Sequence, residues 1–221
     1  DMLKKWEEGD KEVRAVWKKM NKWAFDGFNQ TYKRFGINPD KNYYESKMYD
    51  KGKDIILEGL KKGLFYKDVS GAVMFDLSKK GLGQKVMLRS NGTAVYITQD
   101  IYLARLKYED YKFDKSVYII GNEQDYHTSV LFEALNALGF KWAKGCYHLS
   151  YGMVYLPDGR MKSREGNVVD ADNLMDHMSD LALKEVKKRN PKLSVIKQKQ
   201  IAEKIGLASI KYFILKFSAK K

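Results

Sequence analysis

A basic loop between two glycines is the stretch of this sequence best suited to chemistry. It spans residues 159–166, GRMKSREG, and follows a predicted strand and a turn at 157–159. Glycines let a backbone approach a ligand closely, and Arg160, Lys162 and Arg164 could stabilise phosphate charge without covalent help. Spacing alone favours a solvated basic hairpin. The loop therefore predicts a phosphate site only if other segments support one.

A second candidate segment is YITQD, residues 96–100. Tyr96 and Asp100 are four residues apart, so they face the same way if the segment is helical. An aspartate can hold a guanidinium through two parallel hydrogen bonds, and a tyrosine offers a hydroxyl and a flat ring. The residues alone leave open a plainer alternative, in which Asp100 caps a helix and Tyr96 lies in the core.

A third candidate is GNEQDYH, residues 121–127, which follows a predicted buried strand. Gln124 could bond an amino group or a guanidinium nitrogen, while His127 is as easily a satisfied helix-face histidine as a ligand. Glu123 and Asp125 could cap the following helix. Polar residues packed this closely at the end of a strand often line a site.

A fourth candidate precedes the basic loop and includes a glycine with apolar neighbours. Such an edge can hold an adenine ring flat while backbone groups bond its polar edge. The residues are His148, Gly152, Met153 and Val154.

A predicted strand–helix–strand unit positions these segments. The run SVYII at 116–120 is typical of a buried parallel strand, a helix follows and ends at Gly139, and a second strand covers 145–149. Such a crossover is right-handed, and ligands bind at the carboxyl ends of its strands. The loops after Ile120 and Leu149 should therefore meet at one edge.

The flanking regions are predicted to be helical, with one small sheet. A helix from 10 to 35 has Asp10 as its N-cap and Gly36 as its stop. Its apolar stripe is predicted to be core, and comprises Val13, Val16, Trp17, Met20, Ala24, Phe28, Tyr32 and Phe35. The other predicted elements are a helix at 48–62, antiparallel strands at 64–67, 72–77 and 86–89, a turn at 90–92, an extended piece at 94–98 and a helix at 99–108.

Two further helices are predicted after residue 170. Asp170 or Asp172 could cap the first and Ser194 the second. The first ends in a basic cluster, which either complements the helix dipole or contacts a phosphate backbone. The cluster comprises Lys184, Lys187, Lys188 and Arg189.

Composition narrows the class of protein. With 41 basic and 28 acidic residues the net charge is +13, which favours a polyanionic partner such as nucleic acid. A single cysteine excludes a disulfide framework, and with only three scattered histidines no metal site is expected. We find no apolar run of membrane length and no signal-peptide pattern, so a cytoplasmic protein is expected.

Taken together, the motifs resemble the catalytic domain of arginyl-tRNA synthetases, a class I aminoacyl-tRNA synthetase family. The loop GRMKSREGNVV is similar to the KMSKS signature in the form found in that family, and the resemblance covers nearly the whole chain. The other similar stretches are WEEGDKEVRAVWKKMN, GTAVYITQDI, VYIIGNEQDYH, YHLSYGMVYLPDGRMKSREGNVVDADNL and IGLASIKYFIL.

The resemblance implies roles for the candidate residues. Tyr96, Asp100 and Gln124 would hold the arginine side chain, with His127 at the floor of the site. An adenosine pocket would be lined by His148, Gly152, Met153 and Val154. A mobile catalytic loop over the ATP phosphates would contain Arg160, Lys162, Ser163 and Arg164. Arginine and ATP would give arginyl-adenylate and pyrophosphate with Mg²⁺ assisting, and the arginine would then pass to tRNA.

The resemblance also implies a fold and a division into domains. The expected class is α/β, the second half of a Rossmann-like nucleotide-binding fold with an inserted α+β module and trailing helices. The module would span 1–93, the half-fold 94–170 and the helical region 171–221. KMSKS has a second lysine where this loop has Ser163, and no HIGH-type motif occurs in the sequence. We therefore expect a partial catalytic domain that needs the remainder of a synthetase chain and is inactive alone.

The residues leave two alternative functions, of which the first belongs to a different class. A basic RNA-binding module without catalysis would fit the net charge of +13. A class I synthetase for another amino acid would fit the fold, although the side chains of Asp100 and Gln124 favour a cationic substrate.

Overall fold

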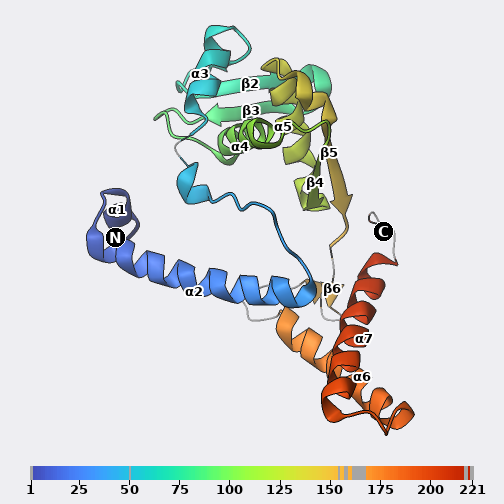
Figure 1. Ribbon diagram of the computed structural model, residues 1–221. Coiled ribbons are helices and arrows are strands. Elements are labelled where there is room, and N and C mark those ends of the chain that lie inside the picture. Colours follow the sequence, from blue (N-terminus) through green and yellow to red (C-terminus); the bar gives the residue numbers. More distant parts are fainter. Residues whose placement is uncertain are drawn as a thin grey trace. The chain divides into compact units, whose positions relative to one another are not determined.

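A computed structural model describes residues 2–49, 51–153, 155–156, 159–160, 168–216 and 219, with only the backbone at 155–156 and 159–160. The chain forms two compact units (Figure 1). Unit 1 comprises Asp1–Lys41 and Leu156–Phe217, and unit 2 comprises Asn42–Tyr155 and Ser218–Lys221. The domain boundaries expected at 93 and 170 stay predictions.

Unit 2 begins with a helix and a small antiparallel sheet. Helix α3 (Lys53–Lys61) is followed by β1 (Tyr66–Lys67), β2 (Val73–Leu77) and β3 (Gly83–Leu88), in the order β1-β2-β3. The predicted sheet is thus confirmed. The helix begins five residues later than predicted, because Gly52 at its N-cap has φ 88° and a short 3-10 turn, η1 (Glu45–Lys47), precedes it.

Helix α4 (Tyr96–Tyr111) begins inside the segment predicted to be extended. Only Ala94 and Val95 of that segment precede the helix. The Val95 N–H donates to Thr98 Oγ1 (3.1 Å), which satisfies one of the donors left over at a helix start, and both Ile97 and Thr98 are buried. The prediction missed this start because the N-cap, Val95, has no capping side chain, and the side-chain bond at this end comes from Thr98 inside the helix.

The predicted strand–helix–strand unit is present (Figure 1). It contains β4 (Ser116–Gly121), η3 (Asn122–Gln124), α5 (Asp125–Ala137), η4 (Lys141–Gly145) and β5 (Cys146–Tyr151). Strands β4 and β5 pair in parallel, from Ser116 opposite Cys146 to Gly121 opposite Tyr151. The carboxyl ends of both strands therefore lie at the same edge, as predicted.

Strand β4 is partly covered on one face and exposed on the other, contrary to the prediction. Tyr118 packs against Phe132 of α5 with ring centroids 5.2 Å apart. On the opposite face Val117 and Ile119 are 52% and 66% exposed. The sheet has two strands among the described residues, and its helices cover one side of it. An apolar run such as SVYII marks a strand but does not report what covers its second face.

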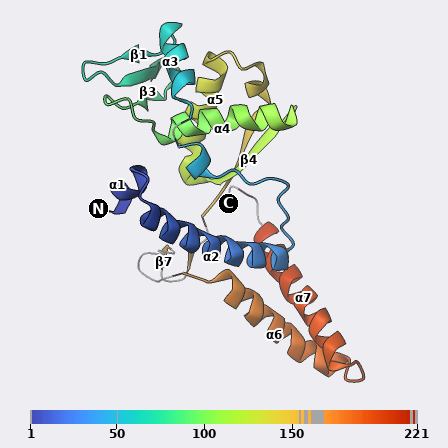
Figure 2. The same cartoon turned by 60° about the vertical axis from the view of Figure 1, so that its left-hand side comes forward.

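The core of unit 2 joins the small sheet to the crossover unit. It packs α3, the antiparallel strands, α4 and α5 into one hydrophobic cluster (Figure 2). Its most deeply buried members include Ile56, Met87, Ile97, Ile101, Val130 and Leu135. This continuous core holds the beginnings of α4 and α5, where the candidate residues Tyr96, Asp100, Gln124 and His127 lie.

Unit 1 is built from helices. Helix α1 (Met2–Glu7) contacts α2 (Lys11–Phe35), while α6 (Ala171–Arg189) and α7 (Val195–Leu215) pack along one another. The short strands β6 (Tyr155–Leu156) and β7 (Gly159–Arg160) pair with each other.

The predicted helix caps of unit 1 are confirmed. Asp10 accepts from the Val13 N–H, and Gly36 ends α2 at φ 79°. Of the two residues proposed for α6, Asp170 is the cap, accepting from the Asn173 N–H, and Ser194 caps α7. Short-range signals of this kind require no knowledge of tertiary packing.

The predicted core stripe of α2 is not a core. None of the residues of this helix is buried, and Met20 and Phe28 are 59% and 53% exposed. The aromatic side chains contact one another along the helix, with Phe28 and Tyr32 stacked at 6.3 Å. Periodicity correctly indicated an amphipathic helix, but its apolar side is covered only in part, as where Trp17 packs against Trp6 of α1 with ring centroids 5.3 Å apart.

Candidate functional site

Asp100 and His127 are in direct contact. His127 Nε2 lies 2.6 Å from Asp100 Oδ2, which joins the second turn of α4 to the first turn of α5. The two side chains are 37% and 23% exposed, so a ligand can still reach the carboxylate. Asp100 does not cap a helix, because α4 begins at Tyr96.

His148 is held inside unit 2 by protein groups on both ring nitrogens. Nε2 lies 3.0 Å from the carbonyl oxygen of Ile120, and Nδ1 lies 2.9 Å from Thr128 Oγ1. The side chain is 11% exposed. His148 therefore ties β5 to β4 and to α5, and its predicted place in an adenosine pocket stays a prediction.

The first turn of α5 has a second anchor that sequence reasoning missed. Asp125 does not cap this helix as predicted; its Oδ1 instead accepts from Ser150 Oγ of β5 at 2.7 Å. Gln124 occupies the N-cap and makes no side-chain cap bond. Thr128 is buried on the same helical face as Leu131 and Leu135, and this apolar spacing was the available signal for its inward orientation.

Gly121 and Met153 meet at the predicted sheet edge. A Cβ added to Gly121 would lie 3.2 Å from Met153 Sδ, so the absent side chain makes room for the methionine. The Gly152 N–H donates to the carbonyl of Ala219 at 2.7 Å. Tyr96 and Gln124 are exposed, Tyr96 one turn before Asp100.

Several predicted residues cannot be located. Lys162, Ser163, Arg164 and Val154 lie outside the described residues, and Arg160 is described only as backbone in β7. The phosphate-binding role of the loop stays a prediction.

The interior below the candidate site is not arranged for thiol chemistry. Burial raises the pKa of the Cys146 thiol, opposed by the charge of Lys107. Burial lowers the pKa of Lys107, opposed mainly by the charge of Asp100. A thiol kept protonated is a poor nucleophile, so Cys146 serves as a packing residue here.

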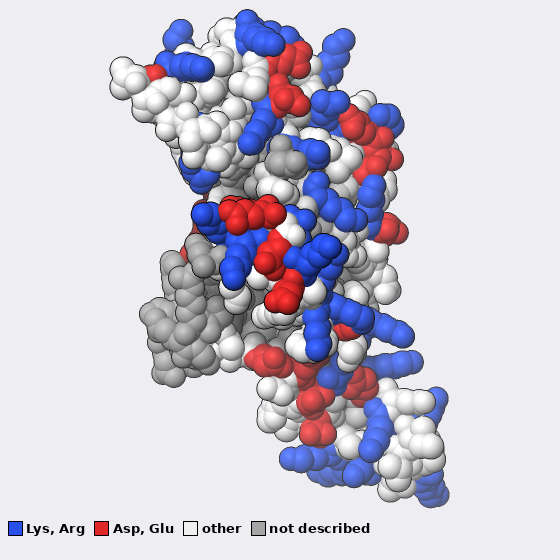
Figure 3. Space-filling view, turned by 90° about the vertical axis from the view of Figure 1, so that its left-hand side faces the viewer, with Lys and Arg blue, Asp and Glu red and all other residues white. Residues whose placement is uncertain are grey.

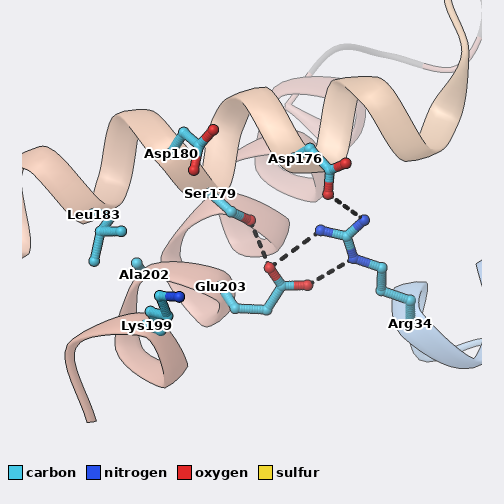
Figure 4. Close-up of a pocket in the computed structure, with 8 residues that line it drawn as sticks. All are labelled: Arg34, Asp176, Ser179, Asp180, Leu183, Lys199, Ala202 and Glu203. Atoms are coloured by element: carbon cyan, nitrogen blue, oxygen red, sulfur yellow. Dashed lines mark hydrogen bonds and ion pairs between the residues drawn. The ribbon is translucent and has the colours of Figure 1, made fainter. Parts of the chain in front are cut away.

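Arg34 forms an ion-pair cluster in unit 1 (Figure 4). Its Nε and Nη2 donate to the two carboxylate oxygens of Glu203 at 2.8 and 3.2 Å, and its Nη1 lies 2.7 Å from Asp176 Oδ1. Ser179 also donates to Glu203. This cluster lines a hollow of about 320 Å³, but none of the lining residues is a candidate site residue. We interpret it as the contact that fastens the end of α2 to α6 and α7.

Replacing Arg34 by methionine removes the guanidinium and should lower the free energy of unfolding by about 1 kcal/mol. The expected loss is small because both carboxylates are partly exposed and screened by water. The pKa of Glu203 is lowered, first by its hydrogen bond from Arg34. A carboxyl group whose pKa is lowered by folding stabilises the folded chain at pH values above its ordinary pKa. That stabilisation is lost as the pH falls through the lowered pKa. Urea unfolding should show that the difference between the two chains shrinks below about pH 4. A difference that stays constant into acid would contradict this assignment.

Charges of both signs are mixed on one face of the described part of the chain (Figure 3). On the face shown in Figure 3, Lys and Arg side chains are interleaved with Asp and Glu. Several cations pair along their own helices, including Lys22 with Asp26 at 2.6 Å and Arg105 with Glu109 at 2.7 Å. On this face the described charges therefore form no continuous basic patch of the kind that a separate RNA-binding module would present (Figure 3).

Two kinds of feature are absent from the described part of the chain. It holds no group of three or more His, Cys, Asp or Glu side chains placed to bind a metal ion. Nor does any described helix have the length and apolar character needed to span a membrane.

Comparison with known proteins gives one consistent family. Residues 1–219 match the family described as tRNA synthetases class I (R), catalytic domain. The arginine–tRNA ligase of Bacteroides thetaiotaomicron is 52% identical over 224 residues, covering all of this chain and 37% of that protein. That of Treponema denticola is 51% identical and covered to 38%. The chain thus spans a little over a third of the length of these curated relatives.

A solved structure agrees on the fold. The arginyl-tRNA synthetase of Plasmodium falciparum superposes with a TM-score of 0.79 at 19% identity, over all of this chain and 37% of that one. Together with the parallel β4–β5 pair, this likeness confirms the predicted α/β class and the Rossmann-like half-fold.

Proposed function

The chain belongs to the family of class I arginyl-tRNA synthetase catalytic domains, and from that premise we propose that it forms part of an arginine–tRNA ligase. In the proposed reaction, arginine and ATP give arginyl-adenylate and pyrophosphate, and the arginine then passes to tRNA. One observation carries the proposal: the Asp100 carboxylate is partly exposed and fixed at the start of α4, beside the first turn of α5. The cytoplasmic location stays a prediction.

Arginine recognition is assigned to Asp100, Tyr96 and Gln124. A carboxylate is the natural acceptor for a guanidinium, whose N–H donors lie in a fixed plane. Tyr96 lies one turn earlier on α4, and Gln124 lies where β4 leads into α5. Support comes from relatives whose names all specify arginine, which favours it over another amino acid.

ATP is proposed to bind at the shared carboxyl edge of β4 and β5, which Gly121 and Met153 occupy. Arg160, Lys162, Ser163 and Arg164 would meet its phosphates. No described cluster of side chains fits Mg²⁺, so we assign no step to the ion. Since no HIGH-type motif occurs in the sequence, we expect this chain alone to show no arginine-dependent ATP–pyrophosphate exchange.

Calorimetric titration of the chain with arginine tests the proposal. Replacing Asp100 by alanine should weaken arginine binding roughly tenfold or more, because a charge-assisted hydrogen bond is lost. Glu109→Ala is the matched control, since Glu109 is also an acidic residue of α4 but pairs with Arg105 on the surface. The Glu109→Ala variant should bind arginine with unchanged affinity.

Equal affinity in Asp100→Ala and the unchanged chain would contradict the assignment of Asp100. A folded chain that releases no heat with arginine would contradict the proposed function for this chain. Circular dichroism establishes folding in each case.

A further inference from the structure

We propose that His127 is a positioning residue, which acts on arginine through Asp100 and does not itself bind the substrate. The inference deepens the proposed function and rests on it. The inference explains how the Asp100 carboxylate keeps one orientation in the chain without arginine.

The contact fixes both partners. An ionised carboxylate only accepts hydrogen bonds, so His127 Nε2 carries the proton that it donates to Asp100 Oδ2 over 2.6 Å. Without this donor the aspartate side chain would be free to choose among rotamers at its half-exposed position. Two carboxylate oxygens offer about four acceptor sites, so the bond to His127 leaves capacity for a guanidinium.

His127 can orient Asp100 because its own helix is anchored on the far side. The neighbouring Thr128 is buried and lies 2.9 Å from His148 Nδ1, while Asp125 accepts from Ser150. These contacts hold the first turn of α5 on β5. Because this turn is fixed, His127 loses little conformational entropy when it donates its hydrogen bond to Asp100. This is the physical basis of preorganised binding.

The geometry also explains why His127 is not assigned to the substrate. Its Nε2 is already donating to Asp100, and the ring is more buried than the carboxylate, at 23% against 37% exposed. A guanidinium carries donors only, so the Nε2–H that contacts Asp100 offers it nothing to bind. The Asp100 carboxylate is the more exposed of the two groups, and His127 contacts it as the less exposed one.

The first test is nuclear magnetic resonance of the histidine ring nitrogens in the chain without arginine. The chain has three histidines, so the signals of His127, His148 and His177 can be separated. We expect His127 to show the Nε2–H form and to shift strongly in Asp100→Asn. Unchanged His127 signals would overturn the proposal, whatever the chain does with arginine. The rings of His148 and His177 should not move.

The second test is arginine affinity in two variants of His127. His127→Leu removes the donor and should weaken binding about tenfold. His127→Gln can place an amide N–H near the position of Nε2 and should restore binding to within about threefold of the unchanged chain. Rescue by glutamine separates positioning from mere packing, since leucine fills the space as well as glutamine does. His177→Gln, an exposed residue of α6, is the matched control and should bind arginine normally.

The outcomes separate this inference from the function on which it rests. Arginine binding that survives His127→Leu overturns the positioning role and leaves the proposed function standing. Arginine binding lost equally in the leucine and glutamine variants also overturns it. Failure of the unchanged chain to bind arginine overturns the proposed function together with this inference.

Discussion

Replacing Gly206 by alanine is expected to lower the free energy of unfolding by about 3 kcal/mol, the upper range for inserting one methyl into a packed contact. Gly206 is buried in α7 where that helix crosses α6. A Cβ there would lie 2.7 Å from the Ser179 nitrogen and 2.9 Å from the Met178 carbonyl carbon. These are backbone atoms of α6 that no rotamer change can move, so the helices must separate.

Denaturant unfolding followed by circular dichroism measures this effect. Gly27→Ala is the matched control, because Gly27 lies inside α2 with nothing within 4 Å of the added Cβ. There alanine should stabilise by roughly 0.5–1 kcal/mol through helix propensity alone. If Gly206→Ala unfolded at the same denaturant concentration as the unchanged chain, the close approach of α6 and α7 would be refuted.

The sequence predicted the elements that depend on short-range signals. Asp10 and Gly36 mark the two ends of α2 within one residue, because a cap requires only a side chain or a positive φ near the helix end. The start of α4 was missed because its N-cap, Val95, offers no capping side chain. Thr98, inside the helix, accepts from Val95 and donates to the Met87 carbonyl of β3, and the second of these contacts is absent from any local pattern.

Burial was harder to predict than secondary structure. Both the stripe of α2 and the outer side of β4 have apolar residues at the correct period, yet Phe28 and Ile119 are exposed. A period reports which face of an element is apolar, whereas burial depends on what packs against that face. Only the tertiary structure shows what packs against an apolar face.

The candidate site was predictable in its location but not in its contacts. A parallel crossover brings the ends of two strands together by topology, which placed the loops after β4 and β5 at one edge. The bond between Asp100 and His127 links residues 27 positions apart on different helices. Its existence depends on the packing of α4 against α5, which spacing along the chain does not encode.

A single methyl group at Gly52 is expected to be strongly destabilising, with a loss of roughly 3–5 kcal/mol in the free energy of unfolding of Gly52→Ala. This glycine has φ 88°, which costs an alanine about 1–2 kcal/mol. The new Cβ would also lie 2.4 Å from the carbonyl oxygen of Thr98. Thr98 cannot retreat, because it is fully buried and bonded to both Val95 and Met87.

Gly63 separates the two contributions, since it lies at the other end of α3 with φ 72° and nothing within 4 Å of an added Cβ. In the same unfolding experiment, Gly63→Ala should lower the free energy of unfolding by only about 1 kcal/mol, the cost of a positive φ for alanine. Thr98 lies between Tyr96 and Asp100, so a shift of its backbone displaces the proposed arginine site. Arginine affinity should therefore fall in Gly52→Ala and stay unchanged in Gly63→Ala. Equal losses of stability in the two variants would show that backbone strain, not the contact with Thr98, makes Gly52 necessary.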